Sequence, residues 1–175
     1  IALKPGAAKD PLFAQVLNRH TPKSDFDTTR AVSADTLRAL VAAGGNASMK
    51  AGGTVDAAAL EPLRELCWQS AKVELLTPRT VMESVHLTRV GPGEILKHRD
   101  GITINTLMIR AVDAVGMFDR KNPPAEGGEA YKTMMSRFQG HSRTAMGFVW
   151  LAGGNSRADQ VNAGRAYVRL QLKAT

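Results

Sequence analysis

The sequence predicts a mainly helical protein with very little sheet. Capping residues followed by Pro or by an apolar helical period recur along the chain, whereas a single run reads as a strand. With 175 residues, 43% hydrophobic and 22% charged, the chain has the composition of one ordinary globular domain. These features exclude a collagen-like or coiled-coil chain and do not indicate disorder.

Helices are expected wherever a cap precedes an apolar run, as in the capping pair Ser156 and Asp159. The predicted helices cover residues 11–19, 33–43, 56–76, 77–90, 94–118, 129–139 and 156–174, with an interruption near Asp100 and Gly101. Residues 91–93 are expected to break a helix, and residues 122–128 to form a loop. The Gly-rich residues 44–53 are expected to form a mobile surface loop, because they lack the spacing of a phosphate-binding loop.

The one predicted strand covers residues 144–152. These residues are almost continuously apolar between polar and Gly residues, which is typical of a strand that is buried on both faces.

The final helix has two apolar ridges at 100° per residue. One consists of Val161, Val168 and Leu172, and the other of Ala163, Ala166, Tyr167, Leu170 and Ala174. We therefore expect this helix to be central and packed on several sides. Gly164 in its middle is unfavourable for a helix, so a close approach by another backbone is expected there.

A narrow polar stripe separates the two ridges and carries three cations, Arg165, Arg169 and Lys173. Cations on a largely buried helix need an anion, which is either a set of carboxylates or a ligand phosphate. The alternative is a solvated seam with scattered ion pairs.

A second basic cluster follows the first helix. It contains Arg19, His20, Thr21 and Lys23, whose cations and hydroxyl can hold a phosphate and a sugar oxygen. Cations that simply complement the dipole of a helix C-terminus explain the same residues equally well.

The charge and cysteine content narrow the possible partners. Lys and Arg number 23 against 16 Asp and Glu, and a net charge of +7 favours an anionic partner. A nucleic acid is not expected, because no helix-turn-helix signature is present and aromatic residues are only 5% of the chain. Cys67 stands alone, which excludes an internal disulfide, and we expect it to be a buried thiol. No metal site and no membrane span are expected.

Two segments resemble a known family. Residues 19–26 with residues 28–32 look like the Arg-rich motif of the nitroreductase-like flavoproteins, and residues 148–175 resemble the strand and central helix of that family. The resemblance is to the C-terminal half of the divergent branch of twin-arginine-signal nitroreductases, which includes the Acg-like proteins. Asp100 and Gly101 also fit that branch.

This resemblance implies an α+β fold, with helices around a small antiparallel-dominated sheet and a long central helix. Residues 1–175 would form a single, incomplete domain that functions with a missing half or as a homodimer. The branch is often exported by a twin-arginine signal, and this sequence shows no such signal.

The implied cofactor is flavin mononucleotide (FMN) at the dimer interface. It would pass electrons from NAD(P)H to nitroaromatic or quinone-like acceptors, with no side chain acting as a catalytic acid or base. Arg19, Thr21 and Lys23 match the phosphate- and ribityl-binding stretch, and we expect Arg165 and Arg169 of the central helix to be neighbours of the same flavin phosphate. His20 would lie near the flavin or pack. The alternative function is a protein that binds or sequesters FMN without turnover.

Overall fold

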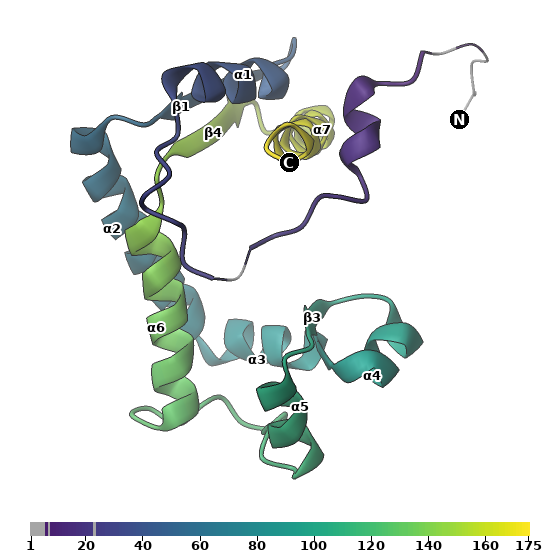
Figure 1. Cartoon of the computed structure of the whole chain (residues 1–175), viewed down its shortest axis with the longest axis vertical. Coiled ribbons are helices and arrows are strands. Elements are labelled where there is room, and N and C mark those ends of the chain that lie inside the picture. Colours follow the sequence, from purple (N-terminus) through teal and green to yellow (C-terminus); the bar gives the residue numbers. More distant parts are fainter. Residues whose placement is uncertain (1–5, 7, 23) are drawn as a thin grey trace. The chain divides into compact units, whose positions relative to one another are not determined.

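The computed structural model describes residues 6, 8–22 and 24–175 (Figure 1). The predicted α+β class is confirmed, since the described residues form seven α-helices, one short 3₁₀ helix and two separate two-stranded sheets. The chain divides into two compact units. Unit 1 is built from Ile1–Arg64 and Arg143–Thr175, and unit 2 from Glu65–Ser142. The single incomplete nitroreductase-like domain stays a prediction.

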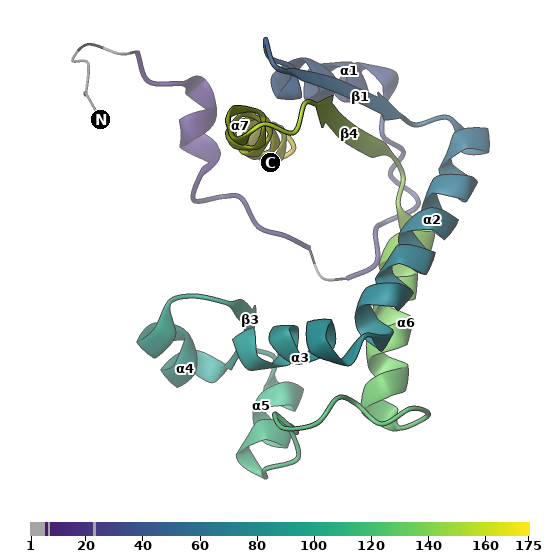
Figure 2. The same ribbon diagram turned by 180° about the vertical axis from the view of Figure 1, so that it is seen from behind.

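Unit 1 is organised around an antiparallel strand pair. Strand β1 (Met49–Thr54) pairs with β4 (Phe148–Gly153), and Gly52 lies opposite Trp150. Helices α1 (Ala34–Gly44) and α7 (Arg157–Lys173) pack on this pair (Figures 1 and 2). The predicted capping box opens α7, where the backbone N–H of Asp159 donates to Ser156 Oγ at 3.2 Å.

The prediction of a mobile loop over residues 44–53 is wrong, because its second half is β1. The glycines there are needed for packing rather than for flexibility. A Cβ on Gly52 would lie 2.5 Å from Nε1 of Trp150, and a Cβ on Gly53 would lie 2.6 Å from Cδ1 of Leu37. Any side chain at these positions would therefore collide with a neighbour across the sheet or on α1.

Two predictions of deep burial are also wrong. Strand β4 is not buried on both faces, since Trp150 is half exposed. Helix α7 buries only one of its ridges: Ala166 is 1% exposed, whereas Val161 and Val168 are more than half exposed. No described atom of another residue lies within 4 Å of a Cβ built on Gly164, so the expected close approach is not made within the described chain.

Unit 2 contains a small β–α–β arrangement. Helix α2 (Ala57–Leu76) enters it and is followed by α3 (Pro78–Leu87), strand β2 (Thr88–Val90), α4 (Gly91–His98), strand β3 (Ile102–Ile104) and α5 (Leu107–Ala114). Helix α6 (Glu129–Thr144) leads back to unit 1. Strands β2 and β3 are parallel, with Thr88 opposite Ile102.

The predicted helix over residues 77–90 ends early, because its last three residues form β2. Residues 91–93 begin α4 instead of breaking a helix. Gly91 takes φ +74°, which turns the chain sharply out of the strand, and Pro92 fits the first turn of a helix, where its missing N–H costs nothing.

Three smaller differences concern element ends and one thiol. The first helix is η1 (Pro11–Gln15), a 3₁₀ helix shorter than the predicted 11–19, and α6 continues five residues beyond the predicted 139. Cys67 is exposed rather than buried. Among the described residues, no helix combines the length and apolar character needed to cross a membrane.

Candidate functional site

One predicted basic cluster of unit 1 lies on α7 itself, and Arg19 of the other cluster contacts this helix. The segment that carries η1 crosses this helix near its C-terminal end (Figure 1). Arg19 Nη1 donates to Gln171 Oε1 at 3.4 Å and to Thr21 Oγ1 at 3.5 Å; Arg19 and Thr21 are exposed, and Gln171 is half-buried. These long contacts with neutral acceptors leave the charge of Arg19 without a carboxylate partner among the described residues.

Arg169 is different, because it is already paired. Its Nη1 forms an ion pair with Asp10, and its Nε donates to the Ala43 carbonyl at 3.3 Å. Asp10 also caps η1 by accepting the N–H of Leu12 at 3.0 Å. That hydrogen bond and the Arg169 guanidinium lower the pKa of Asp10 below its ordinary value. Arg169 therefore fastens the start of η1 to α7.

Arg165 is one turn before Arg169, and its side chain has no hydrogen bond or ion pair with any described residue. It borders an open hollow on α7 together with Val161, Gly164, Val168 and Arg169. This surface combines an exposed apolar ridge with an uncompensated cation.

Of the other predicted residues, His20 and Thr21 form no hydrogen bond with α7 among the described residues. His20 is exposed, and its Nδ1 lies 3.1 Å from the carbonyl oxygen of Asn18 in its own loop. Among the described residues, the Thr21 hydroxyl has a hydrogen bond with Arg19 alone. Lys23 lies outside the described residues. Of the predicted set, Arg165 and Arg169 thus lie on α7, and Arg19 contacts Gln171 of the same helix; no hydrogen bond among the described residues joins the three arginines.

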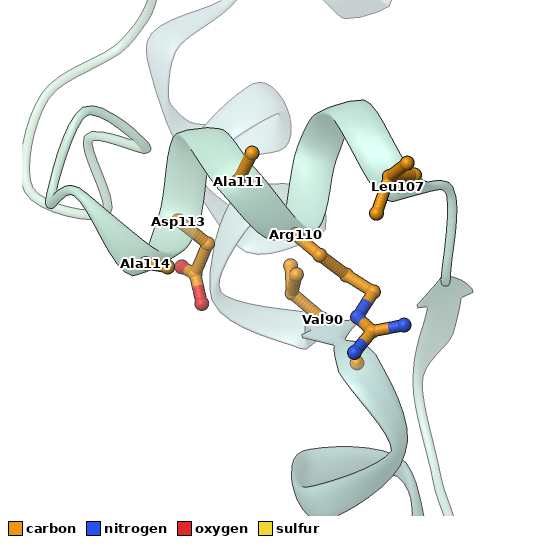
Figure 3. Close-up of a pocket in the computed structure, with 7 residues that line it drawn as sticks. Val90, Leu107, Arg110, Ala111, Asp113 and Ala114 are labelled. Carbon is orange, nitrogen blue, oxygen red and sulfur yellow. The ribbon is translucent and has the colours of Figure 1, made fainter.

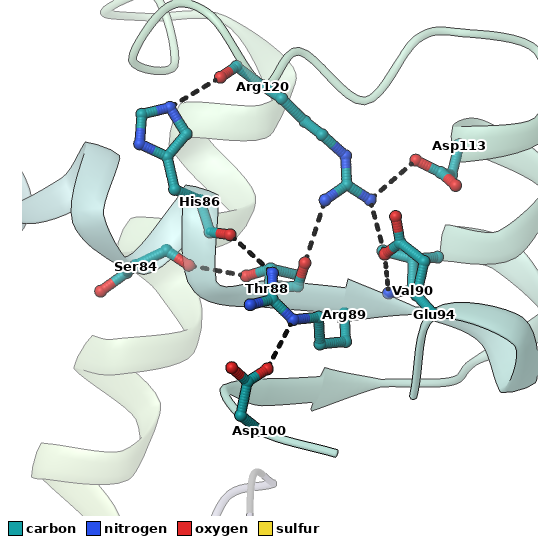
Figure 4. A network of polar contacts seen from close by, with 9 residues as sticks. All are labelled: Ser84, His86, Thr88, Arg89, Val90, Glu94, Asp100, Asp113 and Arg120. Atoms are coloured by element: carbon teal, nitrogen blue, oxygen red, sulfur yellow. Dashed lines mark hydrogen bonds and ion pairs between the residues drawn. The ribbon is translucent and has the colours of Figure 1, made fainter. Parts of the chain in front are cut away.

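A second polar site lies in unit 2 and centres on Arg120 (Figure 4). Its Nη1 donates to the carbonyl of Thr88 at 3.0 Å, and its Nη2 donates to Glu94 at 3.1 Å and Asp113 at 3.2 Å. Glu94 also accepts the N–H of Val90 at 2.8 Å. This hydrogen bond is the main reason why the pKa of Glu94 is lowered, and the nearby Arg120 charge adds to it. One guanidinium thus ties β2, α4 and α5 together.

Arg89 forms a neighbouring clamp on the same strand. Its Nε pairs with Asp100 at 2.9 Å and its Nη1 donates to the His86 carbonyl at 2.8 Å. The Arg89 hydrogen bond is the main cause of the lowered pKa of Asp100. His86 in turn contacts the carbonyl of Arg120 through Nε2 at 3.1 Å. These groups are engaged with one another, which indicates a structural role.

Beside this network lies a hollow of about 400 Å³ at the carboxyl end of β2 (Figure 3). The residues that line it are Val90, Gly91, Leu107, Arg110, Ala111, Asp113 and Ala114. Sequence reasoning missed this hollow because it treated residues 91–93 as a helix breaker. A short β-branched stretch followed by Gly-Pro-Gly was the available signal of a strand-to-helix turn.

Among the described residues, no cluster of three His, Cys, Asp or Glu side chains can hold a metal ion. Comparison of the chain with models of protein families, with curated proteins and with solved structures gives no match.

Proposed function

We propose that unit 1 binds the phosphate of FMN and that the chain belongs to an FMN-dependent oxidoreductase of the nitroreductase type. The observation that carries this proposal is that α7 has two arginines without a carboxylate partner among the described residues, Arg165 on the helix itself and Arg19, which is hydrogen-bonded to Gln171. Unit 1 also contains 13 of the 23 Lys and Arg residues but only 7 of the 16 Asp and Glu residues. An excess of positive charge favours a phosphate-bearing ligand.

The two free arginines fit a phosphate, and Arg169 does not. A guanidinium offers several N–H groups in a fixed fork, and those of Arg19 and Arg165 are exposed and available. Arg169 would have to exchange Asp10 for the phosphate, and the displaced carboxylate would repel it. We therefore assign Arg169 a positioning role and Arg19 and Arg165 the binding role.

Bound FMN supplies the redox chemistry between NAD(P)H and a nitroaromatic or quinone-like acceptor. The chain's own residues bind and orient: Arg19 and Arg165 fix the anionic end, and the Val161–Val168 ridge offers an apolar wall. No described side chain needs to act as an acid or base.

This wall is one-sided, and a planar ring needs a second wall to be shielded from water. The exposed ridge on α7 therefore supports a homodimer, or pairing with a missing half, in which α7 lies at the interface. An apolar ridge with a glycine at its centre suits close helix contact.

The test is titration of the full chain into FMN, in which binding is measured as quenching of the flavin fluorescence. We expect saturable binding, and the double variant R19A/R165A should weaken it by about a hundredfold, from two lost charge-assisted contacts. The matched control is R157A, which removes a charge from the N-terminal end of α7. Among the described residues, the Arg157 side chain is hydrogen-bonded to Gln160 alone. Equal binding by R19A/R165A and R157A, or no binding by the wild type, contradicts the proposal.

Turnover is measured on the same preparations as menadione-dependent oxidation of NADPH. Flavin binding with bleaching by NADPH supports the oxidoreductase. Flavin binding without bleaching contradicts the enzyme and supports the alternative, a protein that sequesters FMN.

A further inference from the structure

One face of α5 is an exposed apolar surface of unit 2 that no described element covers. At 100° per residue, five apolar side chains fall within about a third of the helix circumference. They are Leu107, Met108, Ala111, Ala114 and Val115. The three large side chains are mostly exposed: Leu107 is 81% exposed, Met108 67% and Val115 68%. A continuous patch of this kind on a folded surface marks a place where something binds.

This face borders the hollow of Figure 3, so the surface is recessed rather than flat. Leu107, Ala111 and Ala114 form one side of the hollow, and Val90 at the end of β2 forms another. Its volume of about 400 Å³ matches a small ligand. It also lies at the carboxyl end of a parallel strand, the position at which sheets with helical crossovers bind ligands.

The hollow contains one cation and one carboxylate, and only the cation is available. Asp113 accepts a hydrogen bond from Arg120 at 3.2 Å. The side chain of Arg110 has no hydrogen bond or ion pair with any described residue. Its guanidinium points away from Asp113 and past Val90, as Figure 3 shows. A group that fills the hollow and pairs with Arg110 is therefore an anion.

We propose that this hollow binds a small amphiphilic carboxylate. The carboxylate is held by the Arg110 guanidinium, which matches its two oxygens, and the apolar chain covers Leu107 and Ala111. A small inorganic anion would leave the α5 face in water, and a neutral apolar ligand would leave Arg110 uncompensated. A second copy of the chain is disfavoured as occupant, because the same face carries no free carboxylate for Arg110.

The experiment is calorimetric titration of the full chain with octanoate, octanamide and acetate. Octanoate carries both recognised features, octanamide lacks the charge, and acetate lacks the chain. We expect saturable binding of octanoate at one site, and binding of octanamide and acetate that is weaker by about tenfold or more. Equal binding of octanoate and octanamide, or binding that does not saturate, overturns the proposal.

Two variants locate the site. R110A should weaken octanoate binding by about tenfold. R79A should leave it unchanged, because Arg79 is an equally exposed arginine of unit 2, on α3, that does not line the hollow. Unchanged binding by R110A overturns the proposal. Both side chains are exposed and lack hydrogen bonds within the described chain, so neither variant should disturb folding.

A spectroscopic readout separates this site from other apolar surfaces. The chain has seven methionines, and methyl-labelled methionine gives each of them one resonance. Octanoate should shift the Met108 resonance, assigned by M108L, and this shift should be lost in R110A. If octanoate shifts other methionine resonances but not that of Met108, the proposal is overturned. A concentration-dependent dimer that M108K abolishes also overturns it, because a second copy would then be the occupant.

Discussion

A Cβ on Gly101 would overlap the carbonyl oxygen of Leu87. Leu87 and Gly101 immediately precede the first paired residues of β2 and β3, Thr88 and Ile102. Gly101 also has φ +74°, in the left-handed region that favours glycine. The parallel pair of unit 2 therefore begins at a backbone contact that only glycine permits.

Replacing Gly101 by alanine should destabilise the protein by about 2 kcal/mol or more, measured as the free energy of unfolding in urea. The control is G127A. Gly127 also has a positive φ, +76°, but no described atom lies within 4 Å of a Cβ built on it. G127A should therefore lose only the conformational cost of about 1 kcal/mol. Equal losses in the two variants would show that the Leu87 contact has no energetic weight.

The side chain of Arg120 joins β2, α4 and α5. R120A should lower the free energy of unfolding by about 1–3 kcal/mol, because it leaves Glu94 and Asp113 without their shared cation. R120K should recover only part of this loss, since an ammonium cannot match the fork of a guanidinium toward three acceptors.

The control for loss of charge alone is R79A. Arg79 is exposed, and its side chain has no hydrogen bond to any described residue. A loss in R120A no larger than that in R79A would mean that the network does not stabilise unit 2.

Glu94 should make this stability depend on pH. Its pKa is lowered in the folded protein from 4.5, first by the N–H of Val90 and then by Arg120. The carboxylate therefore stabilises the fold fully above pH 4.5, and this stabilisation is lost as the pH falls through the lower folded pKa.

In E94Q, the decline of the unfolding free energy below pH 4.5 should be shallower than in the wild type. E126Q, in the loop before α6, where no hydrogen bond to a described residue involves the carboxylate, should retain the wild-type slope. Parallel acid profiles for the wild type and E94Q would refute the assignment.

Local signals predicted helix starts well, and distant contacts explain the errors. Ser33, Asp56 and Ser156 cap helices where expected, because a cap acts on the backbone two or three residues away. Strand β1 was missed because its three central residues are small, and their identity is dictated by Trp150 and Leu37 from elsewhere in the chain. A three-residue strand such as β2 is too short for its period to be distinguished from that of a helix.

The candidate site shows the same limit. The sequence identified Arg165, Arg169 and Lys173 as cations in need of an anion, and for Arg169 the structure supplies it within the chain. That anion is Asp10, 159 residues away in sequence. No periodicity or spacing encodes such a pair. The ligand-binding role of Arg19 and Arg165 stays a prediction.

The Asp10–Arg169 pair should keep the N-terminal segment on α7. In D10A, η1 loses both its cap and its ion pair, so amide protons of residues 12–16 should exchange faster with solvent than in the wild type. D27A, which removes a similar local cap at Thr29 without an ion pair to α7, should leave exchange in η1 unchanged. Unchanged exchange in D10A would mean that other contacts hold η1 in place.

Gly164 provides a test of what covers α7. Because its Cβ position meets no described atom within 4 Å, G164A should stabilise the dilute protein by about 1 kcal/mol, the difference in helix propensity. If α7 packs against a second copy across the Val161–Val168 ridge, the added methyl should weaken that dimer, seen by sedimentation as a raised dissociation constant. V168K on the same ridge should weaken the dimer as well. A dimer of wild-type strength in both variants would exclude this ridge as the interface, and FMN would then have to be enclosed by another surface of the chain.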